Sequence, residues 1–131
     1  MPNSDHAPKI MRDLVTTLLL ATGHPNLVDD ARICVSEVVT NVRIHTVTRL
    51  VYLDVTLRPG RVSVAVWDDE WEKRPATAVH DFHSDEERGR GLLLVQCLSA
   101  DWGVTWPADG DPSHKRIWFA LDERAVGAVA A

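Results

Sequence analysis

Cysteine is scarce in this chain of 131 residues, which contains two, Cys34 and Cys97. They lack Cys-x-x-Cys spacing, and no histidine stands beside them as in a metal-binding pair. Both lie in apolar, helix-like contexts, so we interpret them as buried free thiols, the usual state of cysteine in the cytosol. A disulfide-stabilised secreted module is therefore disfavoured.

An excess of positive charge is also missing, because 14 Lys and Arg stand against 19 Asp and Glu. The densest basic run is the short segment 87–90 (ERGR), too little to form a phosphate-binding surface for nucleic acid. The apolar run 14–21 is shorter than the ~20 residues that cross a bilayer, and residues 1–8 contain no apolar signal core. We therefore expect a cytoplasmic protein that binds neither membrane nor nucleic acid directly.

The residues that are present predict one globular domain over 1–131, since 45% of them are apolar and 25% are charged. Small residues make up the tail 126–131, which we expect to fray. Apolar residues then recur at helical spacing near the N-terminus, and Gly23 and Pro25 supply stop signals (Ile10, Leu14, Val15, Leu18, Leu19). A second helix, capped by Asn26, is predicted to run to about Thr46 on a second apolar stripe (Leu27, Ala31, Val35, Val38, Val42).

Strands are predicted after the helices. Residues 51–57 and 62–66 alternate around a Pro59-Gly60 turn, which is typical of a hairpin with one buried face. The same alternation brings Asp68 onto the buried valine face. Further along, a helix is predicted over 92–98 and strands over 104–106 and 116–121, with Lys115 and Arg116 as charges at a sheet edge.

The stretch 69–88 is polar and irregular, so we interpret it as a long loop. Loops of this length in compact domains are usually functional lids or disordered. The whole pattern predicts an α+β fold, a two-layer sandwich. In it a mixed, mainly antiparallel sheet is covered on one face by about three helices.

Glu37 and Asn41 stand out within the second predicted helix, because residues four apart share one face. A carboxylate and an amide among valines are costly unless something polar binds there. As an isolated pair they would more often be an exposed polar edge of an amphipathic helix. Gly89 and Gly91 precede the third predicted helix, where bare backbone can approach a phosphate closely.

Four segments in this order resemble the anti-sigma factor serine kinases, of the ATPase superfamily of gyrase, histidine kinases and mismatch-repair ATPases. They are residues 36–41 (SEVVTN) with His45, 64–68 (VAVWD), 87–95 (ERGRGLLLV) and 115–121 (KRIWFAL). The resemblance runs over roughly 31–121 and implies the Bergerat-type ATPase fold, with 69–88 as an ATP lid.

The resemblance also implies the roles of the site residues. Asn41 would hold Mg²⁺, Glu37 would be the general base, and Asp68 would accept a hydrogen bond from the adenine amino group. Asp68 could alternatively cap the turn after its strand, and His45 fits a helix-end residue better than a catalyst. Around the phosphates the resemblance implies a binding segment of five residues, whose two arginines could equally be solvated lid charges (Arg88, Gly89, Arg90, Gly91, Leu92).

The implied function is that of a regulator that binds Mg-ATP and phosphorylates a serine of an anti-anti-sigma domain protein, thereby controlling a sigma factor. The alternative is a catalytically inactive partner-switching module, with or without ATP. A detached histidine-kinase catalytic domain is disfavoured, because no helix with a phosphoacceptor histidine precedes the predicted fold. Whether two copies form a homodimer is left open.

The chain departs from the family pattern at three places. Glu70 and Trp71 stand where relatives often have a small residue after the adenine-binding aspartate, and Ser113 and His114 replace the glycine usual before the last strand. Relatives also often have a strand ahead of the first helix, where this chain has only 1–8.

Overall fold

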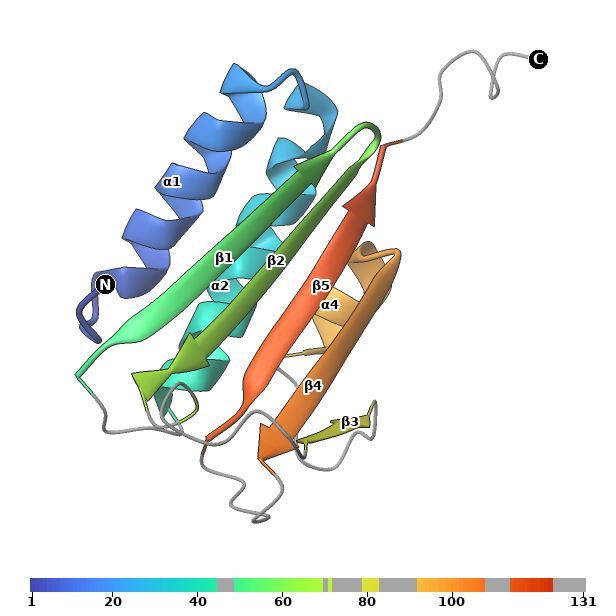
Figure 1. Ribbon diagram of the computed structural model, residues 1–131. Coiled ribbons are helices and arrows are strands. Elements are labelled where there is room, and N and C mark those ends of the chain that lie inside the picture. Colours follow the sequence, from blue (N-terminus) through green and yellow to red (C-terminus); the bar gives the residue numbers. More distant parts are fainter. Residues whose placement is uncertain (45–48, 70, 72–78, 83–91, 108–113, 124–131) are drawn as a thin grey trace.

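A computed structural model describes residues 1–44, 49–69, 71, 79–82, 92–107 and 114–123. Figure 1 shows a helical layer packed on one face of a sheet. The elements follow in the order α1 (Ala7–Ala21), a 3₁₀ turn η1 (Pro25–Leu27), α2 (Val28–Ile44), β1 (Val51–Arg58), β2 (Arg61–Asp68), β3 (Val79–Phe82), α4 (Leu93–Leu98), β4 (Asp101–Pro107) and β5 (Arg116–Asp122).

The sheet has five strands in the order β1-β2-β5-β4-β3, and each of these neighbouring pairs is antiparallel. Helices α1, α2 and α4 all lie on the same side of it (Figure 1). The expected two-layer α+β sandwich is therefore confirmed, with antiparallel pairing throughout the described strands.

The β1–β2 hairpin forms as predicted around Pro59 and Gly60. Gly60 has φ +75°, a left-handed conformation that glycine adopts without strain. Val62, Val64 and Val66 face the helices and are buried. Asp68 follows them in the same alternation and is fully buried, as expected.

The first helix is longer than its predicted apolar stripe and is rotated relative to it. Its core face consists of small and medium side chains at a spacing of four residues (Ala7, Met11, Val15, Leu19). Ile10 and Leu14, which belong to the apolar spacing that predicted the helix, are each 47% exposed. Both interpretations have helical spacing, so periodicity alone could not choose between two faces that differ by one residue.

Asn26 does not cap the second helix. It lies inside η1, whose N-cap is His24, and α2 follows directly from Val28. Asp29 and Asp30 do occupy the first turn of α2, where the helix dipole favours negative charge. The helix is described up to Ile44, so its expected extension to Thr46 lies outside the described residues.

Strand β3 lies within the stretch 69–88 that was interpreted as a loop, and it pairs with β4. Four residues are too few for alternation to predict a strand. The remainder of that stretch, apart from Asp69 and Trp71, lies outside the described residues, as do His45 and the tail 126–131.

Strand β4 begins at Asp101, earlier than predicted. The apolar pattern did not show this start, because Gly103 interrupts it. A Cβ at Gly103 would stand 2.6 Å from Nε1 of Trp118, so the missing side chain admits the indole of the neighbouring strand.

Lys115 and Arg116 are not at a sheet edge, contrary to the prediction. Strand β5 lies between β2 and β4, Lys115 is 3% exposed, and Arg116 lies over the ring of Trp67.

The first residues of the chain pair with the segment that enters β1. Met1 N donates to Val51 O and Val51 N to Met1 O, while Pro2 and Leu50 form an isolated antiparallel bridge. This short pairing stands where relatives often have a strand ahead of the first helix.

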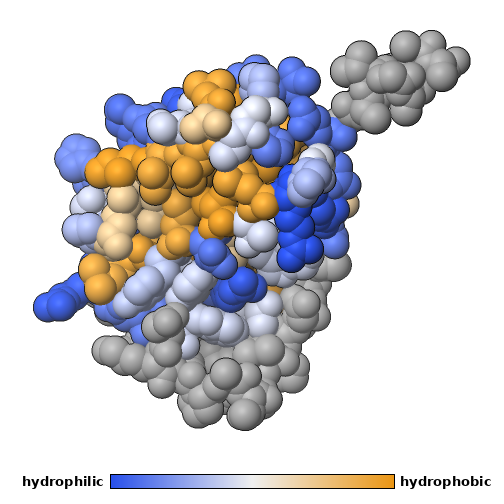
Figure 2. Space-filling view, turned by 45° about the horizontal axis from the view of Figure 1, so that its top comes forward, coloured by the Kyte–Doolittle hydropathy of each residue, from blue (hydrophilic) through white to orange (hydrophobic). Residues whose placement is uncertain are grey.

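Apolar side chains also reach the surface. Figure 2 shows hydrophobic residues gathered across the centre of one face of the molecule. The larger exposed apolar side chains all lie on helices (Ile10, Leu14, Leu20, Ile33, Leu93, Leu94). Within the described ranges, no helix is both long and apolar enough to cross a membrane.

Candidate functional site

Glu37 and Asn41 lie one turn apart on α2, as the sequence predicts. Helix α2 packs beneath β2 and β5, and Figure 1 shows that its C-terminal end and the end of β2 lie at the same end of the molecule. The helix therefore carries Asn41 toward the end of the sheet at which β2 delivers Asp68.

Asn41 is 5% exposed. Within the described part of the chain, no hydrogen-bond donor reaches its Oδ1, although the oxygen is buried. A buried polar oxygen without a partner costs about 1–3 kcal/mol, so its retention calls for an explanation. An oxygen-seeking cation fits, because Mg²⁺ takes oxygen ligands and keeps several waters and phosphate oxygens in its shell.

No group of three or more His, Cys, Asp or Glu side chains in the described ranges could hold a metal ion. A magnesium ion held at Asn41 would take one oxygen ligand from that side chain, and water and a bound phosphate could supply others.

Glu37 is partly buried and lines an open cavity of about 440 Å³ between α1, α2 and α4. Two arginines lie on the same cavity. Arg12 Nη1 donates to Ser36 Oγ at 2.8 Å, and Arg32 Nη1 donates to Thr16 Oγ1 at 2.8 Å and pairs with Asp13 at 3.1 Å. Glu37 therefore lies on an open groove that Arg12 and Arg32 also line.

Neither arginine was singled out from the sequence. Arg12 lies 25 positions before Glu37 and on another helix, so only the packing of α1 against α2 brings it to the cavity. Arg32 is on α2 itself, but its contacts with Asp13 and Thr16 of α1 depend on the same packing. Ile33 and Leu94, 41% and 46% exposed, add an apolar rim to the groove.

Asp68, the last residue of β2, has both carboxylate oxygens occupied. The backbone N–H of Trp71 donates to Oδ1 at 2.9 Å, and Nδ1 of His114 lies 2.9 Å from Oδ2. The Nδ1–Oδ2 distance is that of a hydrogen bond, in which Nδ1 donates when the imidazole carries its proton there. The turn-capping role left open from the sequence is thus present beside the contact with His114.

His114 was noted in the sequence only as a departure from the glycine usual before the last strand. The pairing of β2 with β5, in which Val66 faces Ile117, places it next to Asp68. The sequence therefore marked His114 as unusual for the family, but only the strand pairing shows that its partner is Asp68.

The predicted phosphate-binding segment lies largely outside the described residues, which include Leu92 but not Arg88, Gly89, Arg90 or Gly91. Leu92 is the N-cap residue of α4, and its side chain is fully buried in the core. Any contact of Leu92 with a nucleotide would therefore have to come from its main chain. Glu70 and Ser113, two of the departures from the family pattern, also lie outside the described residues.

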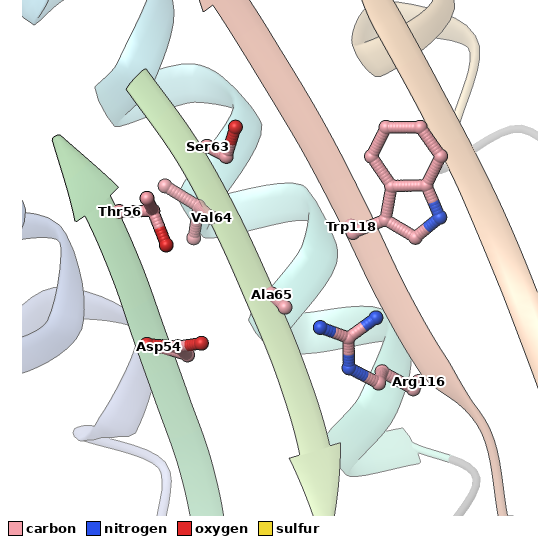
Figure 3. A pocket seen from close by; sticks show the side chains of 7 residues that line it. All are labelled: Asp54, Thr56, Ser63, Val64, Ala65, Arg116 and Trp118. Atoms are coloured by element: carbon pink, nitrogen blue, oxygen red, sulfur yellow. The ribbon is translucent and has the colours of Figure 1, made fainter. Parts of the chain in front are cut away.

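A second hollow, of about 160 Å³, lies on the face of the sheet opposite the helices. Figure 3 shows Asp54 and Thr56 from β1 and Arg116 and Trp118 from β5 around the small side chains of β2. Beside it, the rings of Tyr52 and Trp67 stack with centroids 5.8 Å apart, and Arg116 lies 5.5 Å over Trp67. Among the described residues, none of those predicted to bind the nucleotide lines this hollow.

The family model of the histidine kinase-like ATPase domain matches residues 2–112, which include Glu37, Asn41 and Asp68. No curated protein sequence matches the chain.

Proposed function

The chain belongs to the histidine kinase-like ATPase domain family, and on that premise we propose that it is an anti-sigma factor-like serine kinase. Family membership implies ATP binding. The proposal adds that the chain uses Mg-ATP to phosphorylate a serine of an anti-anti-sigma domain protein, and that it acts in the cytoplasm. That reaction would decide whether a sigma factor is held or released.

The observation that carries the proposal is Asn41, whose buried Oδ1 has no hydrogen-bond partner in the described structure and lies one turn after Glu37. A merely structural helix has no reason to keep such an oxygen. A helix that binds a metal has a reason, because the ion supplies the missing partner.

Besides Glu37, the predicted site residues can each be assigned to one part of a bound Mg-ATP. We assign Asn41 to the magnesium ion, Asp68 to the amino group of adenine, and the segment 88–92 to the phosphates. When bound, Mg-ATP supplies the γ-phosphoryl group and the positive charge that offsets its oxygens. The Asp68 carboxylate supplies recognition of the base, because it accepts hydrogen bonds from an amino group.

Glu37 serves as the general base in this proposal. As the serine oxygen of the partner bonds to the γ-phosphorus and the bond to the departing ADP breaks, the serine proton passes to the Glu37 carboxylate. Its position on an open groove supports this role, since a protein substrate has to reach it from outside. Exclusion of water around the phosphates would let transfer to serine compete with hydrolysis.

A second candidate function is a partner-switching module that binds no nucleotide or does not turn it over. The contact of His114 with Asp68 favours it, because the proposed adenine acceptor is already engaged. Turnover separates the two candidates.

The test is transfer of labelled γ-phosphate from ATP to a purified anti-anti-sigma domain that carries a serine. We expect transfer by the wild type and a rate about 10²–10⁴-fold lower in Glu37→Gln, because that change removes the base while keeping its shape. Thr40→Ala, at an exposed site on the same helix, is the matched control and should transfer normally. Normal transfer by Glu37→Gln would overturn the assignment of the base, and no transfer by the wild type despite nucleotide binding would favour the second candidate.

A further inference from the structure

The buried carboxylate of Asp68 is covered by a side chain from another strand. Asp68 has a side-chain exposure of 1% and His114 one of 15%, with Nδ1 and Oδ2 2.9 Å apart. The two residues come from neighbouring strands, Asp68 from the end of β2 and His114 from the segment just before β5. The contact is therefore a tertiary one, made by strand pairing and not by the local turn.

The two partners of Asp68 differ in how easily they can leave. The N–H of Trp71 belongs to the main chain three residues further on, and it can move only if the turn itself unwinds. The imidazole of His114 swings away by rotation about its side-chain bonds. A ligand amino group that seeks Asp68 therefore has one movable protein group to replace.

We propose that His114 is a gate on the nucleotide site: it holds the Asp68 carboxylate in the ligand-free protein, and a bound adenine amino group takes its place. This inference rests on the proposed assignment of Asp68 to adenine. The open, binding-competent arrangement is then only a fraction of the ligand-free population, and the apparent affinity for nucleotide is lowered by that fraction. His114 is a positioning residue in this account, since it acts on the nucleotide through Asp68.

The proposed gate would make the histidine that replaces the family's glycine before the last strand matter for nucleotide affinity. A glycine before the last strand has no side chain to reach the carboxylate, whereas histidine at this position does. We therefore expect this chain to bind ATP more weakly than its own variant without the imidazole, although Asp68 is the same in both.

The experiment is a titration of Mg-ATP into the wild type, His114→Ala and His114→Asn, followed by calorimetry or tryptophan fluorescence. Removal of the imidazole should tighten binding by about 10-fold or more, because a hydrogen bond to a charged group no longer has to be given up. His114→Asn should stay near the wild type, since its amide can donate to the same oxygen. His24→Ala is the matched control, because His24 is also buried but follows α1, and it should not change the affinity.

A structural role for His114 predicts the opposite sign. Loss of its hydrogen bond would then loosen the site and weaken binding, so equal or weaker binding by folded His114→Ala overturns the gate while leaving ATP binding intact. If the wild type and all variants fail to bind, the proposed function fails and the gate fails with it.

A second measurement on the wild type keeps the gate testable if His114→Ala does not fold. In a spectrum of ¹⁵N-labelled imidazoles, assigned with His114→Asn, the His114 Nδ1 signal should shift when Mg-ATP binds, because its acceptor is taken by the ligand. An unchanged signal at saturating nucleotide would contradict the displacement.

Discussion

At the scale of single residues, Asn41 combines a cost to folding with a proposed use in binding. Its Oδ1 has no hydrogen-bond partner among the described residues, which destabilises the ligand-free protein. We therefore expect Asn41→Ala to lose at most about 1 kcal/mol of unfolding free energy. Val42→Ala, a neighbouring buried truncation without a polar atom, should cost about 2 kcal/mol. Urea unfolding of both variants measures the difference, and a larger loss for Asn41→Ala than for Val42→Ala would show that the asparagine is an ordinary structural residue.

Cys34 and Cys97 are both free, but they differ in burial, and this corrects the expectation that both are buried. Cys97 lies on the exposed side of the short helix α4. Burial, with smaller contributions from the charges of Asp30 and Glu37, raises the pKa of the Cys34 thiol from 9.0 to about 12. Native protein should therefore expose one reactive thiol and unfolded protein two.

The same pKa shift predicts a loss of stability in alkali. The folded state keeps the Cys34 proton more tightly than the unfolded chain does, so this contribution is intact below pH 9 and is lost as the pH rises toward about 12. The free energy of unfolding of the wild type should fall more steeply over that window than that of Cys34→Ala. If the unfolding free energies of the two proteins fall equally steeply with pH, the raised pKa of Cys34 is contradicted.

At the scale of elements, the rotated face of α1 gives a direct test of the fold. Met11→Ala should cost about 2–5 kcal/mol, since Met11 is 2% exposed in the core. Ile10→Ala, next to it but 47% exposed, should change stability by no more than about 0.5 kcal/mol. Chemical denaturation of the two variants measures both effects, and a larger loss for Ile10→Ala than for Met11→Ala would contradict the face that α1 buries.

Elements with a strong local signal were predictable from the sequence. The hairpin had alternating valines around Pro59-Gly60, and the buried position of Asp68 followed from the same alternation. Elements decided by tertiary contacts were not predictable. Strand β3 is too short to have a pattern, and the length of β4 depends on the fit of Trp118 over Gly103.

The candidate site divides in the same way. Glu37 and Asn41 were found because they share one helix, and their roles remain proposals. The contacts of Arg12 and His114 join residues 24 and 46 positions apart in the chain, which no local pattern reports.

At the scale of the whole molecule, the helical layer and the sheet place two polar groups toward one end of the domain, the buried amide of Asn41 and the buried carboxylate of Asp68. Each is expensive to bury, and each has the chemistry to hold a different part of Mg-ATP. Because a ligand that binds only the native state must stabilise it, the proposed site can be tested through the stability of the entire domain.

The most direct test of that claim is thermal unfolding of the wild type with increasing ATP, with magnesium and with EDTA, beside Asp68→Asn and Asn41→Ala. We expect saturable, magnesium-dependent stabilisation of the wild type, about 2.7 kcal/mol at a hundred times the dissociation constant. In Asp68→Asn the stabilisation should be lost, and in Asn41→Ala it should lose its dependence on magnesium. A melting temperature that does not change at millimolar Mg-ATP would contradict the nucleotide site.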